Sequence, residues 1–505
     1  MKECDVLIVG AGPTGLVLAL WLARMGISCR IIDKAEAPGT TSRALAVHAR
    51  TLELYRQLDL TGAVLQNGHK VPAVNLWVKG ERKVHLDFGT VGENLTPYPF
   101  LHIFPQDEHE RLLIARLEQQ GVSVERRTSL VSYREEEGGI VARLGAAGGE
   151  EECHARYIAG CDGARSQVRE TMGIDFPGGT YAQIFYVADV EMAGPAADGE
   201  LHVDLDEADF LALFPLKGQG RARLIGTVRD ERAQHPENLK FEDVADRAIQ
   251  HMKIAVKNVH WFSTYRVHHR VARHFRKGRA FLLGDAAHIH SPVGGQGMNT
   301  GIGDAINLAW KLAWVVKGRA TDALLDTYEP ERIAFARRLV ATTDRVFSFV
   351  SAEGPFADLM RMRVAPLLIP AVGKVEAARE WLFRTVSQTL INYRNSSLSQ
   401  GWVGHVEGGD RLPWAVAAGL DNYAPLADIT WQGHVYGDAG AELRAWFKTG
   451  SIPLHVFSWR EEYAAAGLKK DALYLLRPDT YLALVADRPE PDRLIRYFAE
   501  RHIKA

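Results

Sequence analysis

A glycine-rich turn between two short apolar runs most limits what this chain can fold into. Asp5–Gly10 has the pattern of a strand buried in a parallel sheet, and Gly10-Ala-Gly-Pro-Thr-Gly15 fits G-x-G-x-x-G. Apolar residues then recur at helical spacing up to Gly26, and Ser28–Asp33 has the pattern of a second strand. Strand, turn, helix and strand within about 30 residues are what the dinucleotide-binding fingerprint requires. The sequence therefore predicts a Rossmann-like α/β domain.

Each residue of the turn has a physical task in this interpretation. Gly10 permits the tight turn, Gly12 lets the backbone approach a pyrophosphate, and Gly15 lets helix and strand pack closely. The phosphates would lie at the helix N-terminus, and Asp33 would accept hydrogen bonds from a ribose. A purely structural glycine turn is the alternative. The pattern does not distinguish NAD from FAD, and no second G-x-G-x-x-G follows, so any second dinucleotide must bind transiently.

The same segment invites a membrane interpretation. Val6–Ala23 is eighteen residues without a charge, close to the length of a membrane span or a secretory segment. Three glycines and Pro13 interrupt it, and the residues before it are not predominantly basic. We therefore expect no membrane segment.

Charge and cysteine content narrow the partners further. The chain has 60 Lys and Arg against 62 Asp and Glu, so no global charge attracts nucleic acid or anionic lipid. Its four cysteines form no C-x-x-C pair and no zinc set, and so few suit a reducing compartment. We expect a cytoplasmic protein that binds small molecules, with no metal site.

Two more strand-like runs end in an acidic residue. Arg156–Cys161 leads into Asp162-Gly163, where Ser166 is a plausible N-cap for a short helix. Ala280–Gly284 leads into Asp285 and a glycine-rich loop. An apolar stripe of 3.6-residue period predicts a helix over 299–317.

In this order and spacing, the three motifs resemble the FAD-dependent aromatic hydroxylases of the p-hydroxybenzoate and phenol hydroxylase type, nearest to members acting on aromatic polyketides. The resemblance covers residues 4–345 strongly and the last hundred more faintly. It implies that Arg43 reaches the pyrophosphate, that Gln106 and Asp285 contact the ribityl and flavin region, and that backbone N–H groups of residues 297–299 face the flavin N1/C2-carbonyl edge. The cofactor-binding residues it implies are Gly10, Gly12, Pro13, Thr14, Gly15, Asp33, Lys34, Arg43, Gln106, Asp162, Asp285, Pro292, Gly295, Gly297, Met298 and Asn299.

The resemblance also implies the chemistry. NADPH or NADH would reduce FAD as a transient co-substrate, and O2 would give a flavin C4a-hydroperoxide that hydroxylates a phenolic or polycyclic aromatic substrate. The Pro292 carbonyl would accept the substrate hydroxyl, and His288 or Tyr186 would relay its proton. The alternatives are a loop-bracing histidine and an ordinary strand aromatic. Trp77, Phe210 and Phe214 would line the aromatic site, although such residues more often belong to a core.

A basic run follows the predicted substrate sheet. It is either a solvated edge or a landing site for the phosphates of the pyridine nucleotide or for an acidic substrate. Its members are Arg266, His268, His269, Arg270, Arg273, His274, Arg276, Lys277 and Arg279.

The length of 505 residues suggests about three structural units. We expect strands at 184–190, 210–216 and 222–228 with a helix at 241–253, helical structure at 345–400, and a linker at 395–401. Residues 1–71, 105–180 and 271–400 are assigned to the FAD-binding domain. Residues 72–104 and 181–270 are assigned to the substrate-binding domain.

Residues 405–505 resemble the thioredoxin-like appendage of phenol-hydroxylase-type members, with strands at 454–458, 472–476 and 481–485 and a closing helix at 493–502. Thioredoxin chemistry needs C-x-x-C, and no cysteine follows Cys161. This domain is therefore expected to be structural, as a lid brace or a subunit contact in a possible homodimer.

Other functions stay open at this stage. Baeyer–Villiger oxygenation and epoxidation would use the same scaffold. A flavin halogenase is disfavoured because the chain has no W-x-W-x-I-P. A non-catalytic nucleotide-binding protein is disfavoured by the intact Gly295–Asn299 loop.

Overall fold

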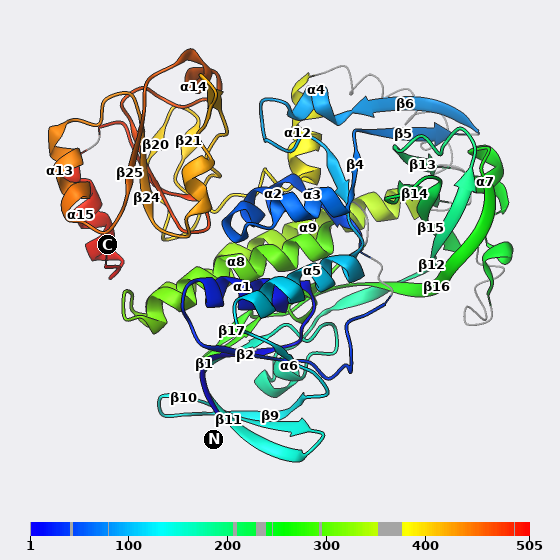
Figure 1. The fold of residues 1–505 in the computed structure, drawn as a ribbon, viewed down its shortest axis with the longest axis horizontal. Coiled ribbons are helices and arrows are strands. Elements are labelled where there is room, and N and C mark those ends of the chain that lie inside the picture. Colours follow the sequence, from blue (N-terminus) through cyan, green and yellow to red (C-terminus); the bar gives the residue numbers. More distant parts are fainter. Residues whose placement is uncertain are drawn as a thin grey trace.

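Two eight-stranded sheets and one four-stranded sheet organise the described part of the chain (Figure 1). The computed structural model describes residues 2–40, 44–78, 80–205, 210–228, 239–244, 246–291, 295–351, 376–488 and 490–504. The predicted fold class is confirmed: a Rossmann-like unit, a second sheet and a C-terminal α/β unit.

The first sheet is built around β1 (Lys2–Val9) in the order β17-β18-β11-β1-β2-β8. β1 runs parallel to both β2 (Cys29–Ile32) and β11 (Gly149–Gly160), and β2 follows α1 (Pro13–Arg24) as the sequence predicts. Its other elements are β8 (Val124–Glu125), β9 (Ser129–Glu136), β10 (Gly139–Ala146), β17 (Arg276–Lys277), β18 (Ala280–Leu282), α5 (Gln106–Gln119), α6 (Gln167–Met172) and α8 (Gln296–Val316).

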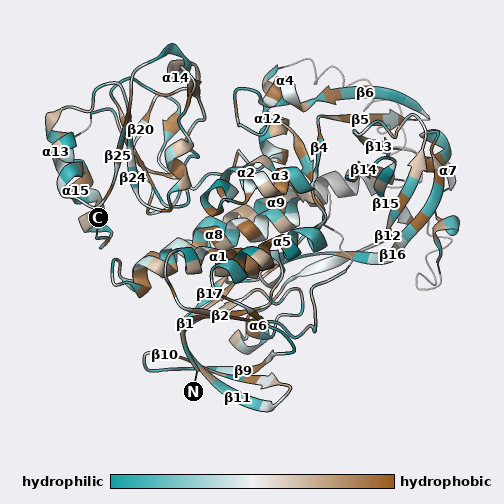
Figure 2. Cartoon of the chain, viewed as in Figure 1, coloured by the Kyte–Doolittle hydropathy of each residue, from teal (hydrophilic) through white to brown (hydrophobic). Residues whose placement is uncertain are grey.

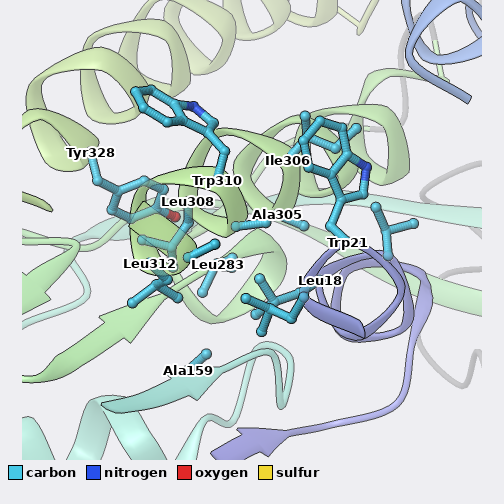
Figure 3. Close-up of a cluster of buried hydrophobic side chains, with 14 of the residues drawn as sticks. Leu18, Trp21, Ala159, Leu283, Ala305, Ile306, Leu308, Trp310, Leu312 and Tyr328 are labelled. Atoms are coloured by element: carbon cyan, nitrogen blue, oxygen red, sulfur yellow. The ribbon is translucent and has the colours of Figure 1, made fainter. Parts of the chain in front are cut away.

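A helix layer covers this sheet, and α1 packs against both α5 and α8 (Figure 1). Leu18 and Trp21 of α1 belong to the same buried cluster as Ala305, Ile306 and Leu308 of α8 (Figure 3). The predicted apolar stripe of α8 is buried, and so are its polar residues Asp304, Asn307 and Lys311. Protein therefore surrounds this helix on all sides.

The second sheet has the order β19-β16-β12-β15-β14-β13-β5-β6. The predicted strands lie within it, while the expected helix at 241–253 is shorter, comprising a 3-10 turn at Phe241–Asp243 and α7 (Asp246–His251). The strands are β5 (Ala73–Val78), β6 (Glu81–Asp87), β12 (Gly178–Ala193), β13 (Leu201–Leu205), β14 (Phe210–Pro215), β15 (Arg221–Val228), β16 (Ala255–Val271) and β19 (His288–Ile289).

Each face of the second sheet carries its own apolar cluster, and Figure 2 shows apolar residues along its strands. Successive strand residues point to opposite faces. Tyr186 belongs to the cluster with Phe241 and Met252, whereas Phe185 belongs to the cluster with Ala46 and Ile103. The second cluster therefore faces a small sheet and its helices: β3 (Ala46–Val47), β7 (Leu101–Ile103), β4 (His69–Val71), α2 (Ala49–Tyr55), α3 (Thr61–Asn67) and α4 (Phe88–Gly92).

The C-terminal sheet has the order β25-β24-β26-β27, with β24 parallel to β25 and antiparallel to β26. This is a βαβ unit followed by a hairpin and a closing helix, as in the predicted thioredoxin-like fold. The elements are β24 (Gln432–Tyr436), α13 (Ala441–Thr449), β25 (Leu454–Phe457), α14 (Glu461–Ala465), β26 (Leu473–Leu476), β27 (Leu482–Ala486) and α15 (Pro491–Glu500), preceded by hairpins β20 (Trp402–Val403) with β21 (Val406–Glu407) and β22 (Val416–Ala417) with β23 (Leu420–Asp421).

The segment between the two units differs from the expected linker. α9 (Tyr328–Ser351) and α12 (Glu376–Val386) fit the expected helical stretch, of which residues 352–375 lie outside the described residues. At 395–401, Ser396 is buried and donates to Glu331 Oε1 at 2.6 Å, and Gln400 pairs with Leu484. Ser396 and Ser399, two of the serines that suggested a linker, instead donate side-chain hydrogen bonds within the folded structure, whereas Ser397 is exposed. No described helix is both long and apolar enough to cross a bilayer.

Candidate functional site

Four predicted residues follow the ends of four parallel strands in the first sheet. Gly10 follows β1, Asp33 follows β2, Asp162 follows β11, and Asp285 follows β18. The carboxyl ends of parallel strands meet at one edge of a sheet, where open α/β folds bind their ligands. The topology therefore brings these four residues to one edge.

The three glycines of the turn are required for different reasons. Gly10 has φ +104°, and a Cβ there would lie 2.3 Å from the Cys161 carbonyl oxygen. A Cβ on Gly15 would lie 2.0 Å from the Gly10 carbonyl oxygen. A Cβ on Gly12 would meet no protein atom within 4 Å. The fold itself therefore requires Gly10 and Gly15, whereas the space beside Gly12 fits a pyrophosphate that approaches the N-terminus of α1.

Thr14 explains two later glycines, one in the turn after β18 and one within α8. A Cβ on Gly284 would lie 2.8 Å from Thr14 Oγ1, and one on Gly301 would lie 2.3 Å from it. Thr14 therefore packs where α1, α8 and the turn carrying Asp285 converge. Pro13 is the first residue of α1, where proline is well suited.

Asp33 holds the glycine turn as well as marking the end of β2. Its Oδ2 accepts a hydrogen bond from Ala11 N at 2.8 Å and its Oδ1 accepts one from Ala35 N at 2.7 Å. The neighbouring Lys34 is exposed.

Arg126 is a residue of this edge that sequence reasoning missed. It directly follows β8, the strand beside β2, and its Nη1 lies 3.8 Å from Asp33 Oδ1. Its Nη2 is buried with no hydrogen-bond partner in the described part of the chain. A guanidinium with an unused donor suits a phosphate oxygen. An arginine directly after a short strand was the available signal.

The N-terminus of α8 is held by the Asn299 side chain. Asn299 Oδ1 accepts hydrogen bonds from His48 N at 2.9 Å and Thr51 Oγ1 at 2.7 Å, while Nδ2 donates to Ala46 O at 2.8 Å and Gly295 O at 3.0 Å. All four contacts are to protein. Gly295, with φ +62°, precedes the first helical residue. The backbone N–H groups of Gln296, Gly297 and Met298 have no carbonyl partner within the helix, so this end suits a ligand with anionic character.

The three other predicted polar residues differ in their exposure and in the hydrogen bonds that they already make. The Asp285 side chain is exposed to solvent, yet desolvation raises its pKa. Both are expected for a carboxyl that has protein around it and one side open to solvent. Asp162 Oδ2 accepts from Val168 N at 3.2 Å while its Oδ1 is buried without a partner among described residues; Ser166 caps α6 as predicted. Gln106 Nε2 donates to Glu110 Oε1 at 2.7 Å.

His288 is placed differently from its expected catalytic role. It is 2% exposed, and its Nε2 lies 2.7 Å from Asp304 Oδ2. The same Oδ2 accepts from Gly284 N at 3.0 Å, and Arg332 Nε donates to Asp304 Oδ1 at 2.6 Å. These contacts favour the alternative interpretation, in which His288 braces the loop, because its Nε2 is already engaged.

His290, two residues further on, is the less committed histidine. Its Nδ1 lies 2.8 Å from Ser291 O; because a carbonyl only accepts, Nδ1 carries the hydrogen. Desolvation, with a smaller contribution from His288, lowers the pKa of His290 to about 4, so the ring is neutral and Nε2 holds a lone pair. Nε2 is buried without a partner among described residues, and it would lie 3.6 Å from a Cβ on Gly297.

The four expected aromatic residues divide between the two faces of the second sheet. Tyr186 and Trp77 lie in the cluster with Phe241 and Met252, on what we call the outer face of the sheet. Tyr186 covers Gly226, and Trp77 Nε1 donates to His202 Nδ1 at 2.9 Å. Their expected contact with substrate is corrected, because the strand alternation points them away from the α8 loop. Phe210 and Phe214 lie in the cluster with Ala46 and Ile103, on what we call the inner face. The same cluster contains three aromatic residues that sequence reasoning did not single out, Tyr181, Trp261 and Tyr265.

The inner face reaches the N-terminus of α8. Ala46 belongs to the inner cluster, and a Cβ on Gly295 would lie 2.7 Å from Ala46 Cβ. The apolar inner face and the helix end are therefore adjacent parts of one region. Two predicted residues of this region, Arg43 and Pro292, lie outside the described residues.

Much of the basic run is engaged by neighbouring groups. Arg273 pairs with Asp175 at 2.9 Å, Arg276 with Asp326 at 2.6 Å, and Arg279 with Glu135 at 3.9 Å. Lys277 donates to Met172 O at 2.6 Å and Arg270 to Phe176 O at 3.2 Å. These contacts favour the interpretation as a solvated edge over that of a phosphate-binding site.

Comparisons with known proteins agree with this geometry. Residues 3–343 match the family model described as FAD binding domain. The chain is 37% identical over 399 residues to the 6-methylpretetramide 4-monooxygenase of Streptomyces rimosus, covering 79% of this chain and 71% of that one. It is 33% identical over 426 residues to the pentachlorophenol 4-monooxygenase of Sphingobium chlorophenolicum, covering 82% and 76%. The structure of the anhydrotetracycline hydroxylase from Streptomyces rimosus superposes over 100% of both chains with a TM-score of 0.80 at 27% identity.

Proposed function

Because this chain belongs to the FAD-binding-domain family of flavin-dependent monooxygenases, we propose that it hydroxylates a phenolic or polycyclic, polyketide-like aromatic compound with NADPH or NADH and O2. The observation that carries this proposal is the adjacency of the strand edge that follows the dinucleotide-binding fingerprint, the N-terminus of α8 and an aromatic inner face. When bound, FAD supplies the oxygen-activating chemistry.

The residues at the strand edge would hold the cofactor. The open space beside Gly12 accommodates the pyrophosphate at α1, and Asp33, Arg126 and Asp285 supply groups for the remainder. The N–H groups of residues 296–298 would stabilise negative charge on the flavin ring. Arg43, Gln106, Asp162 and Pro292 keep the roles that the resemblance implies for them.

The inner face would hold the substrate ring. Phe210 and Phe214, with Tyr181 and Tyr265 beside them, offer flat apolar contact of the kind that aromatic ligands bind. This supports an aromatic substrate by the chemistry of the lining. The relatives named for 6-methylpretetramide and pentachlorophenol point to the same class.

His290 would accept a hydrogen bond from the substrate hydroxyl. Its Nε2 has a lone pair and lies beside the first turn of α8, where the backbone N–H groups are hydrogen-bond donors. A hydroxyl that donates such a hydrogen bond gives the ring part of the electron density of a phenolate, the more nucleophilic form, so an acceptor at this position favours hydroxylation. This assignment replaces His288 and Tyr186.

The organisation of the molecule adds three further proposals. The strands of residues 73–87 and 178–271 share one sheet, which supports a substrate-binding domain at 72–104 and 181–270. The four cysteines are free thiols, which supports a cytoplasmic location. A homodimer is proposed as the assembly, to be tested by light scattering.

The test is oxidation of NADH and NADPH by the purified, flavin-loaded protein across a panel of phenols and polycyclic aromatics, with hydrogen peroxide measured in parallel. We expect at least one aromatic compound to accelerate oxidation and to appear as a hydroxylated product. If no compound does so, the hydroxylase proposal is wrong. A product with oxygen inserted beside a ketone, or an epoxide, would replace hydroxylation by the corresponding reaction.

A further inference from the structure

The turn Arg477–Thr480 between β26 and β27 is buried against the first unit of the chain. Arg477, Asp479 and Thr480 are 0%, 1% and 4% exposed. Arg477 donates to both Glu331 carboxylate oxygens, at 2.7 and 3.0 Å, and Asp479 Oδ2 accepts from Trp310 Nε1 at 3.1 Å. Turns between strands usually face solvent. This one is a polar contact between the C-terminal unit and the helices α8 and α9.

The same turn binds α2 through Arg50. Arg50 Nη2 donates to Thr480 Oγ1 at 2.7 Å and to the Asp479 carbonyl at 3.2 Å. The guanidinium also lies 4.7 Å above the Tyr481 ring and pairs with Glu53 at 3.1 Å. With 3% of its surface exposed, Arg50 is committed to this interface.

The next residue of α2, Thr51, binds the N-terminus of α8 instead of the C-terminal unit. Thr51 Oγ1 donates to Asn299 Oδ1 at 2.7 Å, and the Asn299 amide in turn donates to Gly295 O. We call residues 295–299, the N-cap and first turn of α8, the flavin loop. One turn of α2 therefore contacts the C-terminal unit through Arg50 and the flavin loop through Thr51. A displacement of Arg50 would therefore be passed through Thr51 to Asn299, because packed interiors transmit strain.

We propose that Arg50 is a positioning residue and that the C-terminal unit sets the geometry of the flavin loop through it. This deepens the proposed function and rests on it. The thioredoxin-like fold, which has no thiol pair, serves as a rigid base that presents the 477–480 turn to α2 and α8. When the contact is weakened, the helix N-terminus loses its alignment with the flavin, so that FAD binds less tightly and more of the consumed O2 leaves as hydrogen peroxide.

The test is a double-mutant cycle on FAD affinity with the full-length protein. Arg50→Met removes the contact to the turn and Thr51→Val removes the contact to Asn299. The FAD dissociation constant is measured by flavin fluorescence on the apoprotein, and peroxide release by the loaded enzyme. We expect each variant to weaken FAD binding by roughly tenfold, and the double variant to be no weaker than about tenfold, because both act through one connection.

Milder variants separate positioning from collapse of the fold. Thr480 has φ +69°, so Thr480→Gly keeps the backbone conformation while removing the hydroxyl that Arg50 binds. It should weaken FAD binding by roughly threefold, and Thr480→Ser should restore it. The matched control is Arg56→Gln, which breaks another ion pair to the C-terminal unit, with Asp421 at 2.7 Å, and no hydrogen bond to the flavin loop. It should leave FAD affinity unchanged.

Three outcomes overturn the proposal: wild-type FAD affinity in Arg50→Met, multiplied effects in the double variant, or an equal loss in Arg56→Gln. A wild-type protein that binds no FAD would instead refute the proposed function. The two failures are thus distinguishable, because the second is visible before any variant is made.

Discussion

Asp304 Oδ2 lies 2.7 Å from His288 Nε2, and both side chains are almost completely buried. Burial alone would raise the pKa of Asp304, but the Arg332 charge and His288 outweigh it and hold the pKa below its ordinary 3.8. The carboxylate also accepts from Gly284 N, one residue before Asp285. A single buried charge on α8 therefore fixes the turn that carries Asp285.

Replacement of this charge should loosen the turn. Asp304→Asn leaves Arg332 buried without its counter-charge, which costs about 3 kcal/mol of unfolding free energy, and the purified protein should contain less FAD. Denaturant unfolding and the flavin-to-protein absorbance ratio measure the two effects. Asp326→Asn is the control, because the Asp326 side chain is largely exposed and its ion pair with Arg276 is worth about 1 kcal/mol or less. Equal losses of stability and FAD content in the two variants would show that Asp304 holds the turn no more than an exposed carboxylate does.

The glycine turn allows folding to be separated from cofactor binding. Gly12→Ala adds a methyl group that meets no protein atom, and the backbone φ of −76° is acceptable for alanine. The variant should unfold at the wild-type temperature yet bind FAD at least about tenfold more weakly, because the methyl group occupies the pyrophosphate space. Gly15→Ala should instead fold poorly, since its Cβ meets the Gly10 carbonyl at 2.0 Å. Full FAD binding by Gly12→Ala would contradict the assignment.

Local patterns predicted the strand edge, because strand, turn and helix signals occur within short stretches around Gly10, Asp162 and Asp285. They did not predict which face of the second sheet meets the α8 loop. Alternation separates Phe185 from Tyr186, but only packing decides which of the two faces inward. Contacts such as Thr51 to Asn299 join residues 248 positions apart, and no local pattern records them.

The titration of the substrate tests His290. His290→Leu removes the lone pair of Nε2, so turnover at neutral pH should fall by roughly 100-fold, with FAD content and unfolding temperature unchanged. The deficit should shrink as the pH rises toward the pKa of the phenol, about 10 for an unperturbed ring, because the substrate then ionises without help. Initial rates measured between neutral and alkaline pH decide the matter. A constant deficit at every pH would assign His290 to packing alone.

Glu331 predicts how the interface with the C-terminal unit responds to pH. Burial would raise the pKa of Glu331, but Arg477 and Lys311 outweigh it and hold the pKa well below its ordinary 4.5. A carboxyl with a depressed folded-state pKa stabilises the protein above its unfolded pKa, and this stability is lost as the pH falls. The wild-type protein should therefore lose unfolding free energy progressively below about pH 4.5.

Glu331→Gln should move this dependence to higher pH. Lys311, whose pKa burial already lowers to about 8, loses its counter-charge, so its folded pKa falls further below the ordinary 10.5. The unfolded state then binds more protons, and stability should rise with pH through the neutral range, while the acid loss becomes smaller than in the wild type. Urea unfolding between roughly pH 4 and pH 9 measures both slopes. Glu407→Gln, which breaks a half-exposed pair with Arg394 at 3.4 Å, should leave both slopes unchanged. Wild-type slopes in Glu331→Gln would show that the buried network does not govern the pH response.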